Sequence, residues 1–170
     1  MNTYSQLHGG IEELENYDTN SFDITLCHNV LEYIESKDPI IAELFRVLKP
    51  QGLLSIVKHN RAGRIFHRAV YSNDPVKALA LLDKANDMSN YLGIQYIYSN
   101  DDIIEWAKGY SGVIEKIMGM RTFWSLGQDN TIKYNDDWYN NTFELENRVT
   151  EIDEFKNVAF YNHLLFRKRD

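Results

Sequence analysis

The sequence predicts an α/β protein built on the later part of a doubly wound sheet. Three observations support this: a strand-like apolar run at 21–28, an amphipathic helix that begins near Asp38, and a second strand-like run at 53–58. A strand, a helix and a strand in this order form one right-handed crossover unit. Such units are typical of parallel sheets with helices on their faces. We predict a single partial domain over residues 1–170.

The composition fits one domain with a core of ordinary size. Of the 170 residues, 44% are hydrophobic and 13% aromatic, which is enough to bury such a core. The formal charge of −7 opposes broad attachment to phosphate backbones, although a local basic patch stays open. The sequence shows no long apolar run and no signal-peptide pattern, so we expect no membrane span and a cytoplasmic location. Cys27 is the single cysteine, so we expect no internal disulfide and no metal site.

The first elements follow from local signals. Residues 1–20 are polar and predict a loop or a solvated helical turn. The apolar residues of 21–28 are crowded together, which indicates a central parallel strand covered on both faces. Asp38 as N-cap and Pro39 at the first helical position begin a helix with one apolar stripe. We expect Pro50 and Gly52 to end that helix before the strand at 53–58.

The later elements alternate in the same way. Residues 63–90 predict two helical pieces, the second capped by Asp74, which should cover the sheet. Asn100 or Asp101 should cap a short helix. The remaining predicted elements are a strand at 113–124, a helix at about 136–149 and a strand at about 157–168.

Two stretches resemble the middle of class I S-adenosylmethionine-dependent methyltransferases. The first is Phe22-Asp-Ile-Thr-Leu-Cys-His-Asn-Val-Leu-Glu-Tyr33, and the second is Arg46-Val-Leu-Lys-Pro-Gln-Gly-Leu-Leu-Ser55. In that family the first block is the fourth strand with the loop beneath the adenine. The second block is the end of a helix and the fifth strand, usually written R-V-L-K-P-G-G, where Gln51 replaces one glycine. The resemblance implies a Rossmann-like fold and S-adenosylmethionine as cofactor.

The C-terminal part is similar to a narrower family, the bacterial tRNA 5-carboxymethoxyuridine methyltransferases. The matching stretches are 119–123, 144–146 and 161–163. This similarity implies methyl transfer to a carboxylate oxygen, with the wobble uridine of tRNA as the acceptor.

The family's glycine-rich loop has no counterpart in this sequence, and neither does the acidic residue that binds the ribose. We therefore predict the C-terminal half of the class I sheet, lacking the first strands and the glycine-rich loop. The resemblance assigns cofactor contacts to His8, Gly9, Gly10 and His28. Gly10 stands where the family usually has an aspartate, and loss of that charge-assisted hydrogen bond costs roughly 1.5–3 kcal/mol. We expect weak cofactor binding by this chain alone.

Three residues are predicted to bind the acceptor. Arg121, expected within a strand, has the planar donors that suit a carboxylate, and the alternative is a surface ion pair. Tyr161 and His163 are two positions apart on a strand and share one face, so with Arg121 they could frame a polar pocket. The alternative is a packed pair with satisfied polar tips. Glu32 is predicted to be a helix-start acid and not a catalytic base.

Two further groups of residues are candidates for contact with RNA. We prefer a solvated helix face over phosphate contacts for the first group, which comprises Arg61, Arg64, His67 and Arg68. We prefer core or interface packing over base stacking for the second group, which comprises Trp124, Tyr134, Trp138, Tyr139 and Phe143.

Three functional interpretations stay open. The first is a methyltransferase that needs a partner, either a second copy of the chain or a separate N-terminal-half chain, with tRNA as a possible substrate. The second is a non-catalytic, oligomeric binding module derived from a methyltransferase, because an unpaired parallel strand normally acquires a neighbour. The third is a truncated remnant without activity.

Overall fold

A computed structural model describes residues 6–89 and 93–170. Its strands are β1 (Phe22–His28), β2 (Leu48–His59), β3 (Asp87–Ser89), β4 (Gly93–Gln95), β5 (Gly112–Met120) and β6 (Tyr161–Lys168). Its α-helices are α1 (Asp38–Val47), α2 (Arg61–Phe66), α3 (Pro75–Leu82), α4 (Asn100–Lys108), α5 (Asp136–Val149) and α6 (Asp153–Lys156). Short helical turns are η1 (Ile11–Asn16), η2 (Leu31–Tyr33), η3 (His67–Tyr71) and η4 (Ile132–Tyr134).

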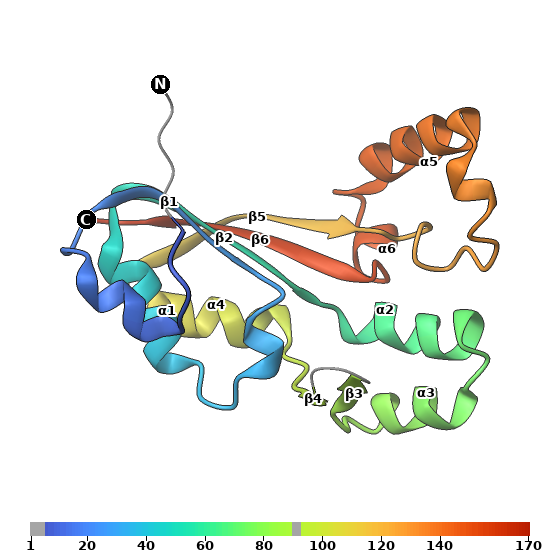
Figure 1. The fold of residues 1–170 in the computed structure, drawn as a ribbon, viewed down its shortest axis with the longest axis horizontal. Helices are drawn as coiled ribbons and strands as arrows, with labels where there is room; N and C mark the ends of the chain where they lie inside the picture. The colour runs from blue at the N-terminus through green and yellow to red at the C-terminus, as the bar shows by residue number, and fades with distance from the viewer. Residues whose placement is uncertain (1–5, 90–92) are drawn as a thin grey trace.

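The main sheet has the order β1-β2-β6-β5. β1 and β2 are parallel, and β6 runs antiparallel to both β2 and β5. β3 and β4 form a separate antiparallel hairpin. α1 connects β1 to β2, so the predicted crossover unit and the α/β class are confirmed (Figure 1).

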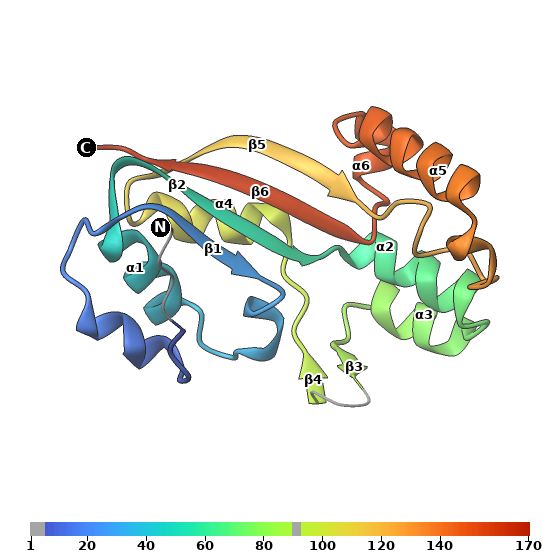
Figure 2. The ribbon, with the colours of Figure 1, turned by 45° about the horizontal axis from the view of Figure 1, so that its top comes forward.

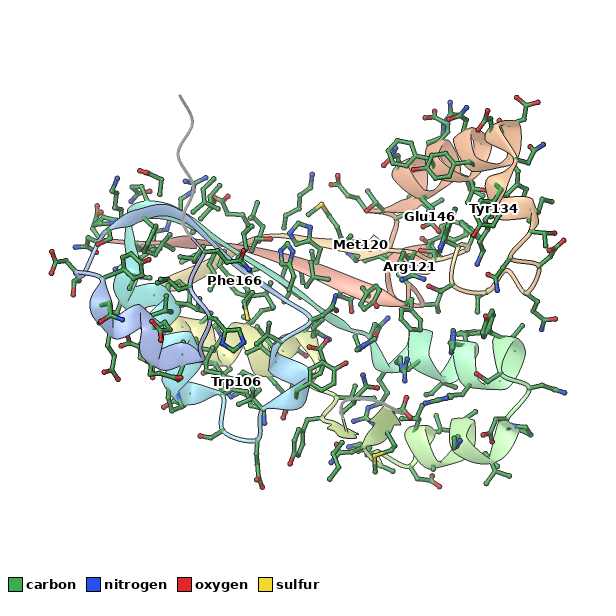
Figure 3. All side chains as sticks on the ribbon, viewed as in Figure 1. Trp106, Met120, Arg121, Tyr134, Glu146 and Phe166 are labelled. Atoms are coloured by element: carbon green, nitrogen blue, oxygen red, sulfur yellow. The ribbon has the colours of Figure 1, made fainter. Side chains whose placement is uncertain are left out.

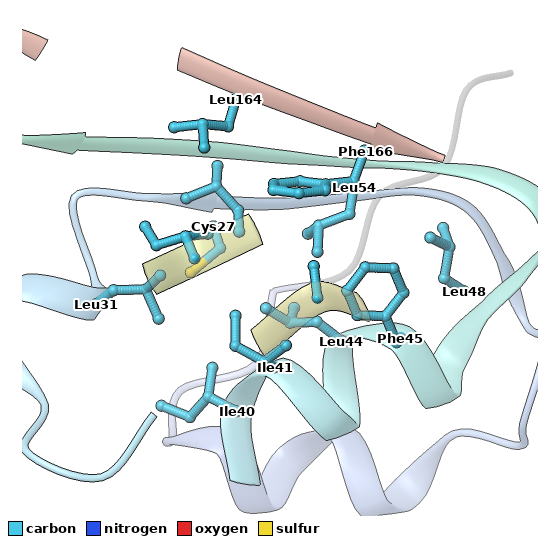
Figure 4. Close-up of a cluster of buried hydrophobic side chains, with 13 residues drawn as sticks. Cys27, Leu31, Ile40, Ile41, Leu44, Phe45, Leu48, Leu54, Leu164 and Phe166 are labelled. Carbon is cyan, nitrogen blue, oxygen red and sulfur yellow. The ribbon is translucent and has the colours of Figure 1, made fainter. Parts of the chain in front are cut away.

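The hydrophobic core lies between the sheet and the helices α1 and α4 (Figure 4). Leu54, Ile56, Leu164 and Phe166 point from β2 and β6 into this layer and are fully buried. From α1 the predicted apolar stripe meets them, with Ile41 and Phe45 at its centre. Ile11 and Leu14 of η1 pack on the edge of the same cluster, so the N-terminal segment contributes to the core although the sequence predicted no such role.

The opposite face of the sheet carries no helix among the described residues (Figure 1). β1 lies at the edge of the sheet, and its side chains alternate between the two faces. Thr25 and Cys27 are buried towards α1, whereas Ile24 and Leu26 are 57% and 64% exposed. The expectation of a central strand covered on both faces is therefore wrong for the described chain.

Several helices and strands begin or end at other residues than the sequence predicted. α1 ends at Val47, and β2 already begins at Leu48 and continues through Pro50, whose missing N–H is tolerated at the first residues of a strand. Asp38 does not cap α1, because its carboxylate accepts a hydrogen bond from the Tyr110 hydroxyl at 3.0 Å. Ser99, and not Asn100, caps α4 through a capping box with Asp102.

The region 61–97 departs most from the prediction. Asp74 caps α3 as expected, with its side chain accepting from the backbone N–H of Lys77. The second helical piece ends at Leu82, however, and β3 occupies part of the stretch predicted as helix up to residue 90. α2 and α3 pack on each other beyond the end of β2 and do not cover the sheet (Figure 2).

Gly63 fixes where α2 meets the sheet. A Cβ at this position would lie 2.1 Å from the carbonyl oxygen of Ala159 and 2.6 Å from the Cα of Phe160. Only glycine permits this approach of backbone to backbone. The contact places Arg64, the next residue of α2, beside the first residues of β6.

The predicted C-terminal elements are present but their bounds differ: β6 begins at Tyr161 and not near residue 157, and the short helix α6 precedes it without having been predicted. α5 has the predicted bounds and is capped by Asn135. β5 ends at Met120, and Arg121 follows it with a left-handed φ of 58°. Arg121 was expected inside the strand, and that expectation is wrong: the chain turns at this residue, beyond the sheet.

Candidate functional site

A basic pocket of about 310 Å³ lies at the carboxyl end of β2, between α2 and the first residues of β6. We use the name basic pocket for the hollow lined by His59, Arg64, His67, Arg68, Met88, Gln95, Arg121, Phe160 and Tyr161. Segments distant in the sequence meet here, because α2, the β3–β4 hairpin and the end of β5 all lie beyond the same end of the sheet (Figure 2).

Positive charge exceeds negative charge in this pocket. Asp87 forms ion pairs with Arg64 and with Arg68, the second at 2.8 Å. Arg64 also donates to the side-chain oxygen of Gln95 at 3.1 Å. Both arginines are largely buried, with side chains 9% and 16% exposed. The preferred interpretation of Arg64 and Arg68 as a solvated helix face is therefore wrong.

Arg121 is the guanidinium of the pocket that pairs with no carboxylate among the residues that the structure describes. Its side chain is exposed and takes part in no hydrogen bond or ion pair with the residues that the structure describes. Its Cζ lies 5.6 Å from the ring centres of both Phe160 and Tyr161, within the range of cation–π attraction. The guanidinium N–H groups therefore stay available to an anion.

The two histidines of the pocket and Tyr161 are neutral at pH 7. Burial, with the charge of Arg64 as the next cause, lowers the pKa of His59 to about 3 and that of His67 to about 4. The buried Nδ1 atoms of both histidines lack a hydrogen-bond partner. Burial raises the pKa of Tyr161, so its hydroxyl stays protonated and can donate. Neutral donors and free guanidinium N–H groups together suit an anionic ligand.

Glu146 of α5 holds the segment that carries Arg121. Its carboxylate accepts backbone hydrogen bonds from Thr122, Phe123 and Trp124, each at 2.9 Å (Figure 3). Charged acceptors make short, strong hydrogen bonds to backbone N–H groups. The turn after β5 is therefore fixed by a helix more than twenty residues further along the chain.

We expect the substitution Glu146→Ala to lower the free energy of unfolding by about 1–3 kcal/mol, because three backbone donors lose their acceptor. Urea unfolding followed by circular dichroism measures this. Glu144→Ala on the same helix is the matched control: its pair with Arg148 is exposed, so the expected loss is below about 1 kcal/mol. Equal losses for the two variants would contradict the role given to Glu146.

Two predicted site residues meet on the open face of the sheet. His28 Nε2 lies 2.8 Å from Ser55 Oγ, and Ser55 Oγ lies 2.7 Å from His163 Nε2. The Ser55 hydroxyl has a single hydrogen and can donate to one ring only, so at least one of the two histidines donates its Nε2–H to Ser55 Oγ. Burial, and then the charge of His28, lowers the pKa of His163.

The structure therefore separates the three residues that were predicted to bind the methyl acceptor. Arg121 and Tyr161 line the basic pocket, whereas His163 is bonded to Ser55 beside His28. Tyr161 and His163 do share one face of β6, as their spacing predicts. The alternative in which the polar tip of His163 is satisfied inside the protein agrees with the geometry. Ser55 was missed, although a serine in the apolar run Leu53–Val57 is a visible signal.

Among the described residues, no hydrogen bond or ion pair joins the predicted cofactor residues. His8, Gly9 and Gly10 are exposed and precede η1, which packs against α1. His28 lies at the end of β1. The cofactor role of these four residues stays a prediction.

Two buried charges lie behind the basic pocket. Glu32 lies in the first turn of η2, as the sequence predicted, but it is 1% exposed and accepts from the backbone N–H of His59 at 2.6 Å. Burial raises its pKa. Lys58 is 3% exposed and donates to the carbonyl oxygen of Tyr98 at 2.8 Å.

Within 6–89 and 93–170, no three His, Cys, Asp or Glu side chains come together as a metal site. No helix in those ranges is both long and apolar enough to span a bilayer.

The strand order and directions define the later part of a class I methyltransferase sheet. Residues 2–56 match the family model described as a methyltransferase domain. A Methanosarcina mazei SAM-dependent methyltransferase superposes with a TM-score of 0.51 at 14% identity, covering 90% of this chain and 62% of that chain. A Haloferax volcanii methyltransferase, solved with the Trm112 methyltransferase activator, gives 0.51 at 10% identity over 91% of this chain and 57% of that chain. The chain thus has a partial Rossmann-like methyltransferase fold, and S-adenosylmethionine is the cofactor of that family.

Two curated relatives are similar to this chain over most of its length and belong to a narrower class of methyltransferase. The tRNA 5-carboxymethoxyuridine methyltransferases of Escherichia coli O157:H7 and K12 are each 24% identical to this chain over 163 residues. The match covers 95% of this chain and 60% of each relative. The chain therefore spans less than two thirds of the length of these relatives.

Proposed function

We propose that this chain forms the acceptor-binding part of a methyltransferase that transfers a methyl group from S-adenosylmethionine to a carboxylate oxygen, on a wobble uridine of tRNA. The observation that carries the proposal is Arg121, an unpaired guanidinium beside the protonated Tyr161 in a pocket with excess positive charge. The similarity to the curated tRNA methyltransferases supports the choice of acceptor.

For the proposed methyl transfer, the main task of the protein is to align the carboxylate oxygen with the methyl carbon. A carboxylate is ionised at neutral pH, so the acceptor needs no general base before it attacks the methyl carbon. Arg121 would orient the carboxylate through its planar N–H groups, and the Tyr161 hydroxyl would donate to it. A very strong ion pair would weaken the nucleophile, and one exposed arginine avoids this.

The cofactor side of the site is incomplete in the described residues. Ligands of doubly wound sheets bind at the carboxyl ends of strands where the strand order reverses. If β1 corresponds to the family's fourth strand, that position lies at the open edge of β1, next to the exposed His28. This edge fits one side of a site for S-adenosylmethionine, which supplies an electrophilic methyl group when bound. We propose that a further segment, in the same polypeptide or in a partner, supplies the glycine-rich turn.

Methyl transfer from radiolabelled S-adenosylmethionine to tRNA containing 5-carboxymethoxyuridine, by the chain together with the segment or partner that completes the cofactor site, tests the proposal. The same tRNA with unmodified uridine is the control acceptor. We expect label only in the modified tRNA, and a decrease of about 10- to 100-fold in kcat/KM for Arg121→Ala, because a hydrogen bond to a charged group is lost. Label in both tRNAs, or full activity of Arg121→Ala, would overturn the assignment of the acceptor site.

A second candidate is a non-catalytic binding module. It is favoured by the exposed apolar residues Ile24 and Leu26 on the open sheet face and by the unpaired edge of β1. Titration calorimetry with S-adenosylmethionine and its demethylated product, together with the solution mass, tests whether a second copy of the chain completes the cofactor site. Micromolar binding by a self-associated chain supports the methyltransferase. No binding at millimolar cofactor by a folded, monodisperse sample excludes completion by a second copy, and the binding module is then favoured if no further segment or partner restores binding.

A further inference from the structure

A second hollow, of about 310 Å³, lies on the other side of Arg121. We call it the aromatic pocket, and it is lined by Gly119, Met120, Arg121, Trp124, Tyr139, Thr142, Phe143, Glu146, Asn147 and Thr150. It lies between the end of β5 and α5, and Figure 3 shows Met120, Arg121 and Glu146 gathered there. Arg121 also lines the basic pocket, so the two pockets are neighbours that share one guanidinium.

The aromatic side chains of this pocket are not core residues. Tyr139 and Phe143 are 48% and 58% exposed. Their rings are nearly parallel, with an interplanar angle of 2° and centroids 6.4 Å apart, and Tyr139 meets Trp124 edge to face at 5.9 Å. Core packing is therefore wrong for Tyr139 and Phe143, whereas the expected interface role stays a prediction. Exposed aromatic faces of this kind stack on planar rings.

Hydrogen bonds within the chain fix the shape of the aromatic pocket without a ligand. Its floor is tied to β5 by Thr150, whose hydroxyl donates to the carbonyl of Gly119 at 2.6 Å while the Gly119 N–H donates to the Thr150 carbonyl at 2.6 Å. Glu146 fixes the backbone of Trp124. A preorganised pocket loses little conformational entropy on binding.

Size and charge restrict the occupant. A volume of about 310 Å³ is at the lower end for ligand pockets and suits a single small ring system. Both oxygens of the Glu146 carboxylate already accept from backbone N–H groups, so among the described lining residues Arg121 offers the charged donors that are not engaged. The pocket therefore favours a flat ring that carries, or lies next to, an anionic group.

We propose that the aromatic pocket binds the pyrimidine ring of the acceptor nucleoside, stacked on Tyr139 or Phe143, with the ring's anionic substituent directed to Arg121. The inference rests on the proposed function and adds the position of the base. Asn147 lies at the pocket wall with a side chain that can both donate and accept, as the edge of a uracil requires.

The test observes Trp124 directly, without cofactor. The chain contains three tryptophans, so its ¹⁵N-labelled form gives three indole N–H signals by NMR, assigned by single Trp→Phe substitutions. The probes are uridine, 5-carboxymethoxyuridine and methoxyacetate, each titrated to its solubility limit. We expect both nucleosides to shift the Trp124 signal, the modified one at lower concentration. Trp106 packs against the core on the far face of the sheet and is the internal control.

Substitution identifies the stacking partner. Phe143→Ala should weaken binding of both nucleosides about 5- to 100-fold, since stacking on an aromatic contributes about 1–3 kcal/mol per base. Tyr134→Ala is the matched control, because Tyr134 is 89% exposed on η4 near α5 and does not line the pocket. Thermal unfolding of each variant checks that the fold is kept.

The outcomes separate this inference from the proposed function. A Trp124 signal that no nucleoside moves, or that methoxyacetate moves equally, overturns the ring site even if methyl transfer to tRNA is observed. Nucleoside binding that depends on Phe143 supports the ring site even if the chain alone transfers no methyl group.

Discussion

Asp87→Ala is expected to lower the free energy of unfolding by about 3–5 kcal/mol. The Asp87 carboxylate is the acid that pairs with both Arg64 and Arg68, and its side chain is 4% exposed. Removing one partner of a buried ion pair leaves the other charge without compensation in a medium of low polarity. Urea unfolding at pH 7 measures the loss. Asp83→Ala, an exposed aspartate at the end of α3, should change the value by less than about 0.5 kcal/mol.

The ion pairs of Asp87 with Arg64 and Arg68 also make the free energy of unfolding depend on pH. Burial alone would raise the pKa of Asp87, but hydrogen bonds from Arg68 and the charge of Arg64 outweigh it and hold the pKa below its ordinary value of 3.8. A lowered pKa in the folded state stabilises the fold above the unfolded-state pKa, and this stabilisation is lost as pH falls through the folded-state value. Wild type and Asp87→Ala should therefore converge in stability as the pH falls below about 4. A constant difference down to pH 2 would contradict the pairing.

Lys58→Met should change the stability in a pH-dependent way in the alkaline range. Burial lowers the pKa of Lys58 from 10.5 to about 8. Between these values the unfolded state binds the proton and the folded state does not, so raising the pH favours the folded wild type. A shift of this size corresponds to about 3 kcal/mol. Relative to Lys58→Met, the wild type should gain up to this amount between pH 7.5 and 10.5.

Chemical unfolding at several pH values measures this gain. The hydrogen bond from Lys58 to the Tyr98 carbonyl, which methionine cannot make, is stronger for the charged ammonium, so its change with pH is already included in the pKa of Lys58. Lys49→Met on the same strand is the control, because Lys49 is 43% exposed and pairs with Asp23 at the surface. Equal slopes for Lys58→Met and Lys49→Met would show that Lys58 is not buried as described.

The sequence predicted the elements whose signals are local. α5 begins after a capping Asn135 and ends as its polar and apolar pattern requires. α3 begins at Asp74 for the same reason. β1 and β2, joined by α1, follow from apolar runs and the stripe of one helix. The motifs in these segments were also sufficient to predict the methyltransferase fold, which the comparisons support.

The sequence failed where the environment of a residue depends on distant segments. Arg64 and Arg68, at helical spacing, predicted a solvated face, because nothing local shows that Asp87 folds back onto them. The end of β5 at Met120 was missed because the turn at Arg121 is fixed by Glu146 of α5. The exposure of Tyr139 and Phe143 could not be predicted, since aromatic residues on a helix usually face a core.

By itself, therefore, the sequence determined the class of fold, the order of the strands of the main sheet along the chain and three of the side chains worth testing, Arg121, Tyr161 and His163. Only the tertiary structure decided which of them act together: it placed Arg121 and Tyr161 in one basic pocket and His163 with His28 around Ser55. The physical reason is that helix and strand signals are read over a few neighbouring residues. The charge, burial and partners of a side chain are set by backbone that the fold brings from far along the chain.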